Sequence, residues 1–297
     1  MMKTRKPWVA AVLSLLCPGL GQFYNGDWIW PLISVFIGSA MTIVATYVLF
    51  DSLVKLVIAI VIGFVFDSIF AVHAYYQAKR VGEIAPRSYH SWWGYILFAA
   101  LLYAVPDGYG YLIPRRFLSF EIPSQSMVPT LLVGDRLVAD GWAFLKDGPK
   151  VGDVIVFDYP QDHQIKYVKR VIGLPGDEVS VKHGRITRNG TELSYAGESQ
   201  TVAIDVSGGY DKFSETIGAV AHAVYFSRMM SAAEFGPIKV PEGKYFVMGD
   251  NRDRSSDSRV WGFVKREEII AKMSYVYFSW DPEGHRFRSE RVGEQIQ

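Results

Sequence analysis

The sequence predicts a membrane protein whose N-terminal transmembrane helices are followed by a mostly antiparallel β domain. Hydrophobic residues make up 49% of the 297 residues, a high share for a soluble protein, and the excess lies before residue 113. From residue 132 onward, short runs of β-branched and aromatic residues alternate with Gly, Asp and Pro, as in short antiparallel strands. We therefore expect a membrane module at 1–80, a cytoplasmic loop and last transmembrane segment at 81–116, and an extracytoplasmic β-rich domain at 117–297.

The first apolar run is interrupted. Lys3, Arg5 and Lys6 precede residues 8–20, as in a secretory signal peptide, but no small-x-small cleavage site follows. Pro18-Gly19 breaks the run, and a bilayer crossing needs about 20 apolar residues. We therefore expect residues 8–24 to form a re-entrant or interfacial segment.

Two longer runs, residues 28–50 and 53–76, are each long enough to cross a membrane, and we expect them to form a helical hairpin. The second run contains Asp67. An acid inside a membrane helix usually faces other helices or a polar cavity. Because no second acid follows in the helix, we expect a helix-packing contact for Asp67 rather than a role in transport.

Basic residues give the expected topology. The short loop at 77–90 carries Lys79, Arg80 and Arg87, which places it in the cytoplasm. If the N-terminal basic cluster is cytoplasmic as well, an even number of crossings separates the two. Residues 92–113 then form the last crossing, and the β domain lies outside.

The segment Pro18-Gly-Leu-Gly-Gln-Phe-Tyr-Asn-Gly26 resembles the Pro-Gly-Leu-Gly-Gln-x-Tyr-x-Gly signature of small two-helix membrane modules. This resemblance implies a membrane module and no chemistry. Cys17, the only cysteine, excludes an intrachain disulfide and is expected to pack as a small hydrophobe. The net charge of +1 argues against a nucleic-acid partner.

In the second half, residues 153–159 and 165–174 have the composition of strands. Turn signals follow at Pro175-Gly-Asp177 and at Asn189-Gly190, which suits a type I′ hairpin turn. Further strands are expected at 241–250 and 271–279. Residues 195–240 are less regular, 214–221 stays open between helix and loop, and the charged tail is expected to fray.

Two serines, Ser124 and Ser126, lie between Pro123 and Pro129, which predicts a rigid extended or turning segment rather than a helix. In an extended chain, alternation would put both hydroxyls on the same side. By itself this pattern fits an ordinary loop equally well. A serine hydroxyl becomes a good nucleophile only when a base removes its proton.

Lys169 is the candidate base. The six histidines stand in no metal-ligand spacing or motif, so we expect surface or packing roles for them and no Ser-His-Asp arrangement. Period-2 alternation puts Lys169 on one strand face with Tyr167, while Arg170 points the other way. Burial among apolar neighbours would lower the pKa of the Lys169 amine. The alternative is an ordinary exposed strand lysine.

An acid-rich stretch at 248–263 could suggest a calcium loop, but the spacing fails. Counting from Asp250 or Asp253 puts Trp261 or Val264 where the closing glutamate of an EF-hand belongs. We expect instead a hydrogen-bonded loop that supports a site, with a solvated polar loop as the alternative. No metal and no cofactor is expected.

Three motifs occur in order: Pro123-Ser-Gln-Ser-Met-Val-Pro-Thr-Leu131, Tyr167-Val-Lys-Arg-Val-Ile-Gly-Leu-Pro-Gly-Asp177 and Gly249-Asp-Asn-Arg-Asp-Arg-Ser-Ser-Asp-Ser-Arg259. Together they closely resemble bacterial type I signal peptidase, over residues 117–280. The resemblance implies a Ser-Lys dyad serine protease, multi-pass in the bacterial cytoplasmic membrane. Its partners would be the lipid bilayer and exported preproteins, whose signal peptides it removes on the extracytoplasmic side.

The same resemblance implies roles for individual residues. Ser126 would be the nucleophile and Lys169 the general base, with the Ser124 hydroxyl and the Ser126 amide donating to the oxyanion. Ser255 would hydrogen-bond Lys169, and Asp257 and Arg259 would form a supporting ion pair. The pockets for small side chains before the cut would be lined by Phe120, Ile122, Met127, Leu131, Tyr167 and Val168.

Two alternatives remain at this stage. The first is a maturation peptidase specialised for one secretion or conjugation client, which would fail to cleave a generic preprotein. The second is a membrane scaffold that keeps the peptidase fold without turnover, which a missing Ser126 or Lys169 would have favoured. The module before residue 80 goes beyond what anchoring requires, and its role stays open.

Overall fold

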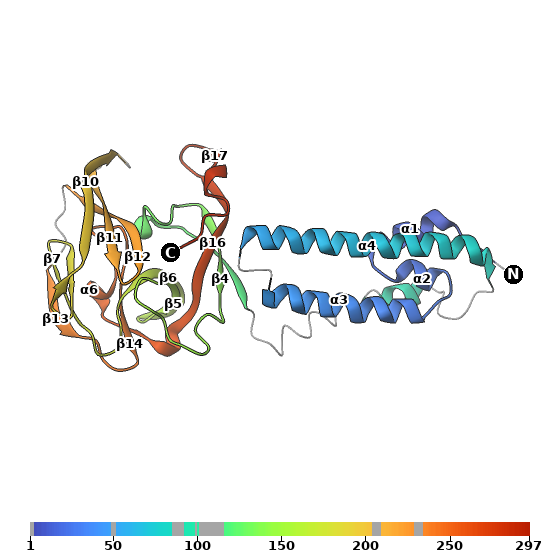
Figure 1. Cartoon of the computed structure of the whole chain (residues 1–297), viewed down its shortest axis with the longest axis horizontal. Coiled ribbons are helices and arrows are strands. Elements are labelled where there is room, and N and C mark those ends of the chain that lie inside the picture. The colour runs from blue at the N-terminus through green and yellow to red at the C-terminus, as the bar shows by residue number, and fades with distance from the viewer. Residues whose placement is uncertain are drawn as a thin grey trace. The chain divides into compact units, whose positions relative to one another are not determined.

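The computed structural model describes residues 3–48, 52–84, 92–98, 100, 116–203, 209–228 and 234–297. The chain divides into two compact units, Met1–Arg115 and Arg116–Gln297 (Figure 1). Within the predicted last crossing, residues 92–98 are helical. The rest of that crossing, apart from residue 100, and most of the predicted loop before it lie outside the described residues.

The N-terminal unit is helical. Its elements are β1 (Lys3–Thr4), α1 (Pro7–Leu16), α2 (Leu20–Tyr24), α3 (Ile29–Val48), α4 (Leu53–Val81) and β2 (Glu83–Ile84). The predicted re-entrant or interfacial segment therefore folds as two short helices, α1 and α2. Helix α4 continues beyond the predicted end at 76, because Gln-Ala-Lys-Arg are good helix formers and Gly82, at φ 63°, follows the last turn.

Helix α4 has 29 residues and is, in the part of the chain that the structure describes, the one helix long and apolar enough to cross a membrane. Large apolar side chains along it point outward: Val54, Ile60, Phe64 and Ile69 are each at least 60% exposed. An apolar surface of this extent is unfavourable in water and suits a lipid environment.

The signature residues hold α1 and α2 against α4. Ala10 packs on Ala74 and Ala78, and a Cβ on Gly21 would lie 2.0 Å from the Ala10 carbonyl oxygen. The Gln22 side chain donates to the carbonyl oxygen of Phe70 at 2.8 Å, and Asn25 donates to that of Ala74 at 2.8 Å. These buried amides explain the signature as a packing device. Cys17 is buried, as predicted.

The C-terminal unit is built from antiparallel strands, as the sequence predicts. The strands are β3 (Phe117–Glu121), β4 (Asp135–Asp140), β5 (Val154–Tyr159), β6 (Asp162–Gly173), β7 (Glu178–Lys182), β8 (Arg185–Arg188), β9 (Thr191–Glu192), β10 (Ser194–Ala203), β11 (Gly209–Ile217), β12 (Val220–Ser227), β13 (Phe235–Lys239), β14 (Lys244–Met248), β15 (Val264–Lys265), β16 (Ile269–Asp281) and β17 (Arg286–Phe287). Short helical turns lie between them: η2 (Gln125–Met127), α6 (Ser258–Trp261), η3 (Arg266–Glu268) and η4 (Ser289–Arg291).

The largest sheet has the order β15-β14-β6-β5-β16-β4-β3, with β17 paired to β16 (Figure 1). Two smaller sheets have the orders β13-β7-β8-β9 and β10-β11-β12. Strand β6 lies directly between β14 and β5. Consequently the residues of β6 lie beside the end of β14 and the loop that follows it, which are remote from β6 in sequence.

Residues 214–221, which the sequence left open between helix and loop, are strand and turn. They end β11, turn at Gly218 (φ 59°) and begin β12. Ile217 and Val224 are fully buried, while Thr216 and Ala221 on the same two strands are exposed. The apolar residues follow a period of two, so both helix and irregular loop were the wrong expectation.

The charged tail is not frayed, which corrects a second expectation. Ile296 is buried in the core cluster that contains Leu137 and Val276. The Arg291 guanidinium donates to the buried Asp135 carboxylate at 2.7 Å. A buried carboxylate is costly without a partner, and the tail supplies that partner.

We predict that Arg291→Met lowers the free energy of unfolding by about 3 kcal/mol, because it leaves the buried Asp135 carboxylate unpaired. Urea unfolding of the full chain in detergent measures this change. Arg286→Met is the matched control, since the Arg286 side chain is 70% exposed beside Asp281, and it is expected to change the midpoint little. Equal midpoints for the two variants would contradict the tail's role.

Candidate active site

Ser126 and Lys169 meet, although 43 positions separate them in the sequence. Ser126 lies in η2, between β3 and β4, and Lys169 lies in β6. The Lys169 amine nitrogen Nζ is 2.7 Å from the Ser126 hydroxyl oxygen Oγ. The Ser124 hydroxyl lies 3.3 Å from that of Ser126. The segment is thus a helical turn rather than an extended chain, but the two hydroxyls do lie together.

The surroundings of Lys169 favour its neutral form. The residue is 4% exposed, and this burial lowers the pKa of its amine to about 8, although the Asp257 and Asp250 carboxylates act in the opposite direction. Nζ also donates to the carbonyl oxygen of Val168 at 3.0 Å and lies 5.3 Å from the centre of the Tyr167 ring. A lysine with this pKa is partly neutral near physiological pH and can accept a proton.

The loop after β14 holds the serine turn in place. The Asn251 backbone N–H donates to the Ser126 carbonyl oxygen at 3.2 Å, and the Asn251 side chain donates to that of Gln125 at 3.2 Å. Gly249 lies close to Ser126 and to Ser255 of the same loop. A Cβ on Gly249 would lie 2.4 Å from the Ser126 carbonyl oxygen and 2.3 Å from the Ser255 hydroxyl oxygen. The acid-rich stretch is therefore a hydrogen-bonded supporting loop.

Further along this loop, Asp257 and Arg259 form the ion pair that the resemblance implied, with the Arg259 Nε atom 2.8 Å from Asp257 Oδ1. Asp257 also accepts a hydrogen bond from the Gly249 backbone N–H at 3.1 Å. The implied hydrogen bond between Ser255 and Lys169 is absent. Within the described residues the buried Ser255 Oγ has no hydrogen-bond partner, since the amine is directed at Ser126 and Val168 instead.

A buried ion pair beside Lys169 escaped the sequence analysis. The Arg170 guanidinium donates to both oxygens of the Asp250 carboxylate, at 2.9 and 2.8 Å. Asp250 also accepts a hydrogen bond from the Thr130 hydroxyl at 2.5 Å. Burial alone would raise the pKa of the Asp250 carboxyl, but the Arg170 charge and these hydrogen bonds hold it below its ordinary value. Alternation correctly put Arg170 opposite Lys169, but both faces of β6 are covered at this point.

The six residues expected to line the substrate pockets belong to two hydrophobic clusters. Ile122, Met127 and Leu131 are buried in one core cluster, and Phe120 and Val168 pack against it while partly exposed. Tyr167 belongs to a different cluster, which includes Phe157 and Trp261. Among the residues that the structure describes, no three His, Cys, Asp or Glu side chains come together as metal ligands would.

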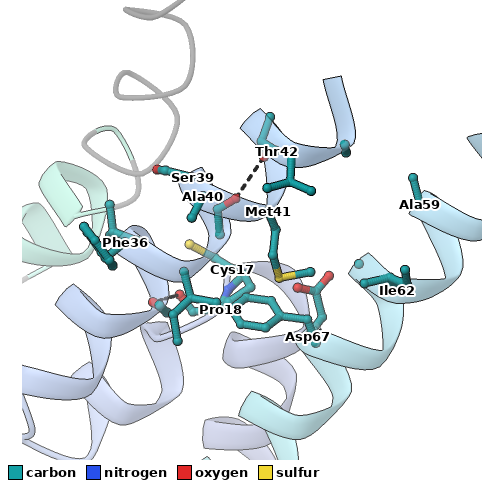
Figure 2. Close-up of a pocket in the computed structure, with 18 residues that line it drawn as sticks. Cys17, Pro18, Phe36, Ser39, Ala40, Met41, Thr42, Ala59, Ile62 and Asp67 are labelled. Atoms are coloured by element: carbon teal, nitrogen blue, oxygen red, sulfur yellow. Dashed lines mark hydrogen bonds between the residues drawn. The ribbon is translucent and has the colours of Figure 1, made fainter. Parts of the chain in front are cut away.

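The N-terminal unit has a cavity of its own, with a volume of about 590 Å³, between α3 and α4. Figure 2 shows Asp67 beside Met41 and Cys17 at its wall. No hydrogen bond or ion pair with another described residue engages the Asp67 carboxylate. Asp67 therefore lies at the wall of a cavity between two helices, and the helix-packing role expected for it stays a prediction. None of the residues around Ser126 belongs to this cavity.

The antiparallel β fold and a serine hydroxyl held against a buried amine define a serine hydrolase that uses lysine as its base. Residues 91–280 match the family described as "Signal peptidase, peptidase S26". The chain belongs to this family.

Three curated relatives are all described as "Signal peptidase I". The protein of Pseudomonas fluorescens is 38% identical over 61% of this chain and 73% of its own length. Those of Aquifex aeolicus and Buchnera aphidicola from Acyrthosiphon pisum are 37% and 30% identical, over 54% and 59% of this chain and 75% and 73% of their own lengths. These relatives support the family assignment.

We predict that Gly249→Ala lowers peptidase activity at least a hundredfold, because the added methyl group displaces the Ser126 carbonyl or the Ser255 side chain, and small misplacements of reacting groups are costly. Cleavage of a preprotein in detergent micelles measures this. Gly63→Ala is the matched control, since a Cβ on Gly63 meets no atom within 4 Å. A fully active Gly249→Ala enzyme would show that this close fit is not needed.

Proposed function

We propose that this member of the signal peptidase family removes N-terminal signal peptides from exported preproteins, with Ser126 as the nucleophile and Lys169 as the general base. The observation that carries the assignment of these residues is the 2.7 Å contact between Lys169 Nζ and Ser126 Oγ. The burial of Lys169 supports it, because only the neutral amine can take the serine proton.

In the first step the Ser126 oxygen attacks the carbonyl carbon of the scissile peptide bond while its proton passes to the Lys169 nitrogen. The negative charge that develops on the carbonyl oxygen is stabilised by the Ser124 hydroxyl and the Ser126 backbone N–H. Lys169 then gives its proton to the leaving amine of the mature protein. This leaves the signal peptide as an ester on Ser126.

In the second step a water molecule attacks the ester carbonyl carbon, and Lys169 accepts a proton from that water. The Ser126 oxygen leaves the carbonyl carbon and recovers its proton from Lys169, which frees the carboxylate end of the signal peptide. Asp257 and Arg259 keep the supporting loop in place throughout. Small residues before the cut suit the buried cluster around Met127 and Leu131, to which Phe120 and Val168 give the partly exposed edge.

We further propose that the chain is a multi-pass protein of the bacterial cytoplasmic membrane, with its β unit on the extracytoplasmic side. The pairing of Lys3 with Ile84 and of Thr4 with Glu83 brings the N-terminal basic cluster to the end of α4 that carries Lys79 and Arg80. This arrangement supports a cytoplasmic position for both basic clusters. Holding enzyme and the apolar part of the substrate in one bilayer raises their effective concentration.

We predict that Ser126→Ala and Lys169→Ala each abolish cleavage of a purified preprotein in detergent micelles, since they remove the nucleophile and the base. Lys265→Ala is the control, because the Lys265 side chain is 51% exposed and lies outside the three motifs. Full activity of Ser126→Ala would overturn the assignment. A wild-type enzyme that cuts no generic preprotein would point instead to a single specialised client.

We also predict that kcat/KM rises with pH through about 8 and is level above it. The pKa of the Lys169 amine in the enzyme without substrate is about 8, and the base works only when deprotonated. A series of initial rates at constant ionic strength measures this profile. An ascending limb near the ordinary pKa of histidine, about 6.5, or of lysine, about 10.4, would contradict a buried lysine base.

A further inference from the structure

His222 lies between two buried carboxylates. It is in β12, directly opposite Glu215 of β11 in the strand register, and its side chain is 3% exposed. The ring nitrogen Nε2 is 3.3 Å from Glu215 Oε1 and 3.6 Å from Asp250 Oδ1. A surface or packing role was expected for this histidine; its ring is buried and lies beside both acids.

Through these two acids, His222 contacts both parts of a buried network of polar side chains. Glu215 accepts a hydrogen bond from the Arg252 guanidinium at 2.5 Å, and Arg252 in turn lies 3.5 Å from the Tyr195 hydroxyl of β10. Asp250 is bound by Arg170 at 2.8 Å and by Thr130 at 2.5 Å. On the Asp250 side, this network of polar contacts reaches Arg170, the residue after Lys169. It also reaches Thr130, in the loop that carries Ser126.

The charged groups of this buried network form two ion pairs, Arg170 with Asp250 and Arg252 with Glu215. Two guanidinium groups face two carboxylates, and each carboxylate also turns an oxygen toward His222. Neither ring nitrogen has a hydrogen-bond partner of ordinary geometry among the described residues, but Nε2 is the ring atom that lies 3.3 and 3.6 Å from the two carboxylate oxygens. A polar ring atom between two buried carboxylates is more favourable there than an apolar side chain, even though each carboxylate also has a guanidinium partner.

Strand β12 also binds the supporting loop through its backbone. The Tyr225 N–H donates to the Asp250 carbonyl oxygen at 2.9 Å, and the Arg252 N–H donates to the Tyr225 carbonyl oxygen at 3.0 Å. Asn251, which lies between these two bonds, holds the Ser126 carbonyl oxygen at 3.2 Å. The β11–β12 hairpin is therefore bound to the loop that fixes the nucleophile.

We propose that His222 is a positioning residue for the peptidase reaction: an N–H on Nε2, directed between the Glu215 and Asp250 carboxylates, keeps Asp250 aligned with Thr130 and Arg170 and so fixes Ser126 against Lys169. This inference rests on the proposed function of Ser126 and Lys169. It gives the β11–β12 hairpin a part in catalysis, although it contributes no group that touches the substrate.

The inference predicts a change in the pH profile. The Asp250 carboxylate already favours the charged form of Lys169. Removing the His222 donor leaves that negative charge less compensated, which favours charged Lys169 further. The ascending limb of kcat/KM therefore moves to higher pH, by about half a unit or more, while a purely structural defect would lower the amount of active enzyme without moving the limb.

The test compares His222→Phe, which keeps the ring volume and removes the donor, with His222→Gln, whose amide restores an N–H near the position of Nε2. Activity on a preprotein is measured across pH with the full chain in detergent, per folded enzyme from near-ultraviolet circular dichroism. We expect kcat of His222→Phe to fall about tenfold with KM little changed and the limb shifted upward. His222→Gln is expected to stay within about threefold of wild type, because it keeps the donor.

The matched control is His163→Phe. The His163 ring also lies beside a buried glutamate, 3.5 Å from Glu268, but it is 60% exposed and is expected to leave kcat and the limb unchanged. If His222→Phe does not fold, His222→Leu replaces it, since leucine also has no hydrogen-bond donor. Wild-type kcat and an unmoved limb in a folded donor-free variant would overturn the proposal. Activity in Ser126→Ala would instead overturn the proposed function itself.

Discussion

The buried Asp250–Arg170 ion pair is the interaction on which the active site depends. It joins three segments that are far apart in sequence: the loop after β14, strand β6 and the turn that carries Thr130. Both partners are almost fully buried, at 1% and 0% exposure. Breaking a buried pair leaves an uncompensated charge, so neither partner can move without a large cost. The neighbouring positions of Lys169 and Ser126 are thereby held as well.

Around this pair the protein lowers the pKa of one amine among many charged groups. The acidic and basic side chains near or behind the site form three ion pairs: Asp250 with Arg170, Glu215 with Arg252, and Asp257 with Arg259. Among the residues that the structure describes, Lys169 has no such partner, and its Nζ meets a hydroxyl and a carbonyl oxygen as hydrogen-bond acceptors. Pairing thus keeps the surrounding charges ionised, while burial without a counter-ion lowers the pKa of the lysine that has to accept protons.

The N-terminal unit follows a different rule. Its polar residues serve helix packing, since the amides of Gln22 and Asn25 are satisfied by helix carbonyl oxygens. Its apolar residues face outward along α4, where a bilayer would meet them. The cavity beside Asp67 is separate from the peptidase residues. Thus the two halves of the chain use buried polar groups for different ends, packing in one and chemistry in the other.

The antiparallel β class, the apolar first half and the pairing of Ser126 with Lys169 could be predicted from the amino-acid sequence, because period, composition and ordered motifs are local properties. The effects of long-range contacts became visible in the folded chain alone. These contacts made Arg170 a buried partner of Asp250, tied the tail to Asp135 through Arg291, turned residues 214–221 into a hairpin and brought His222 between two acids. Burial and charge pairing depend on which strands become neighbours, and the spacing of residues along one strand does not indicate which strands these are.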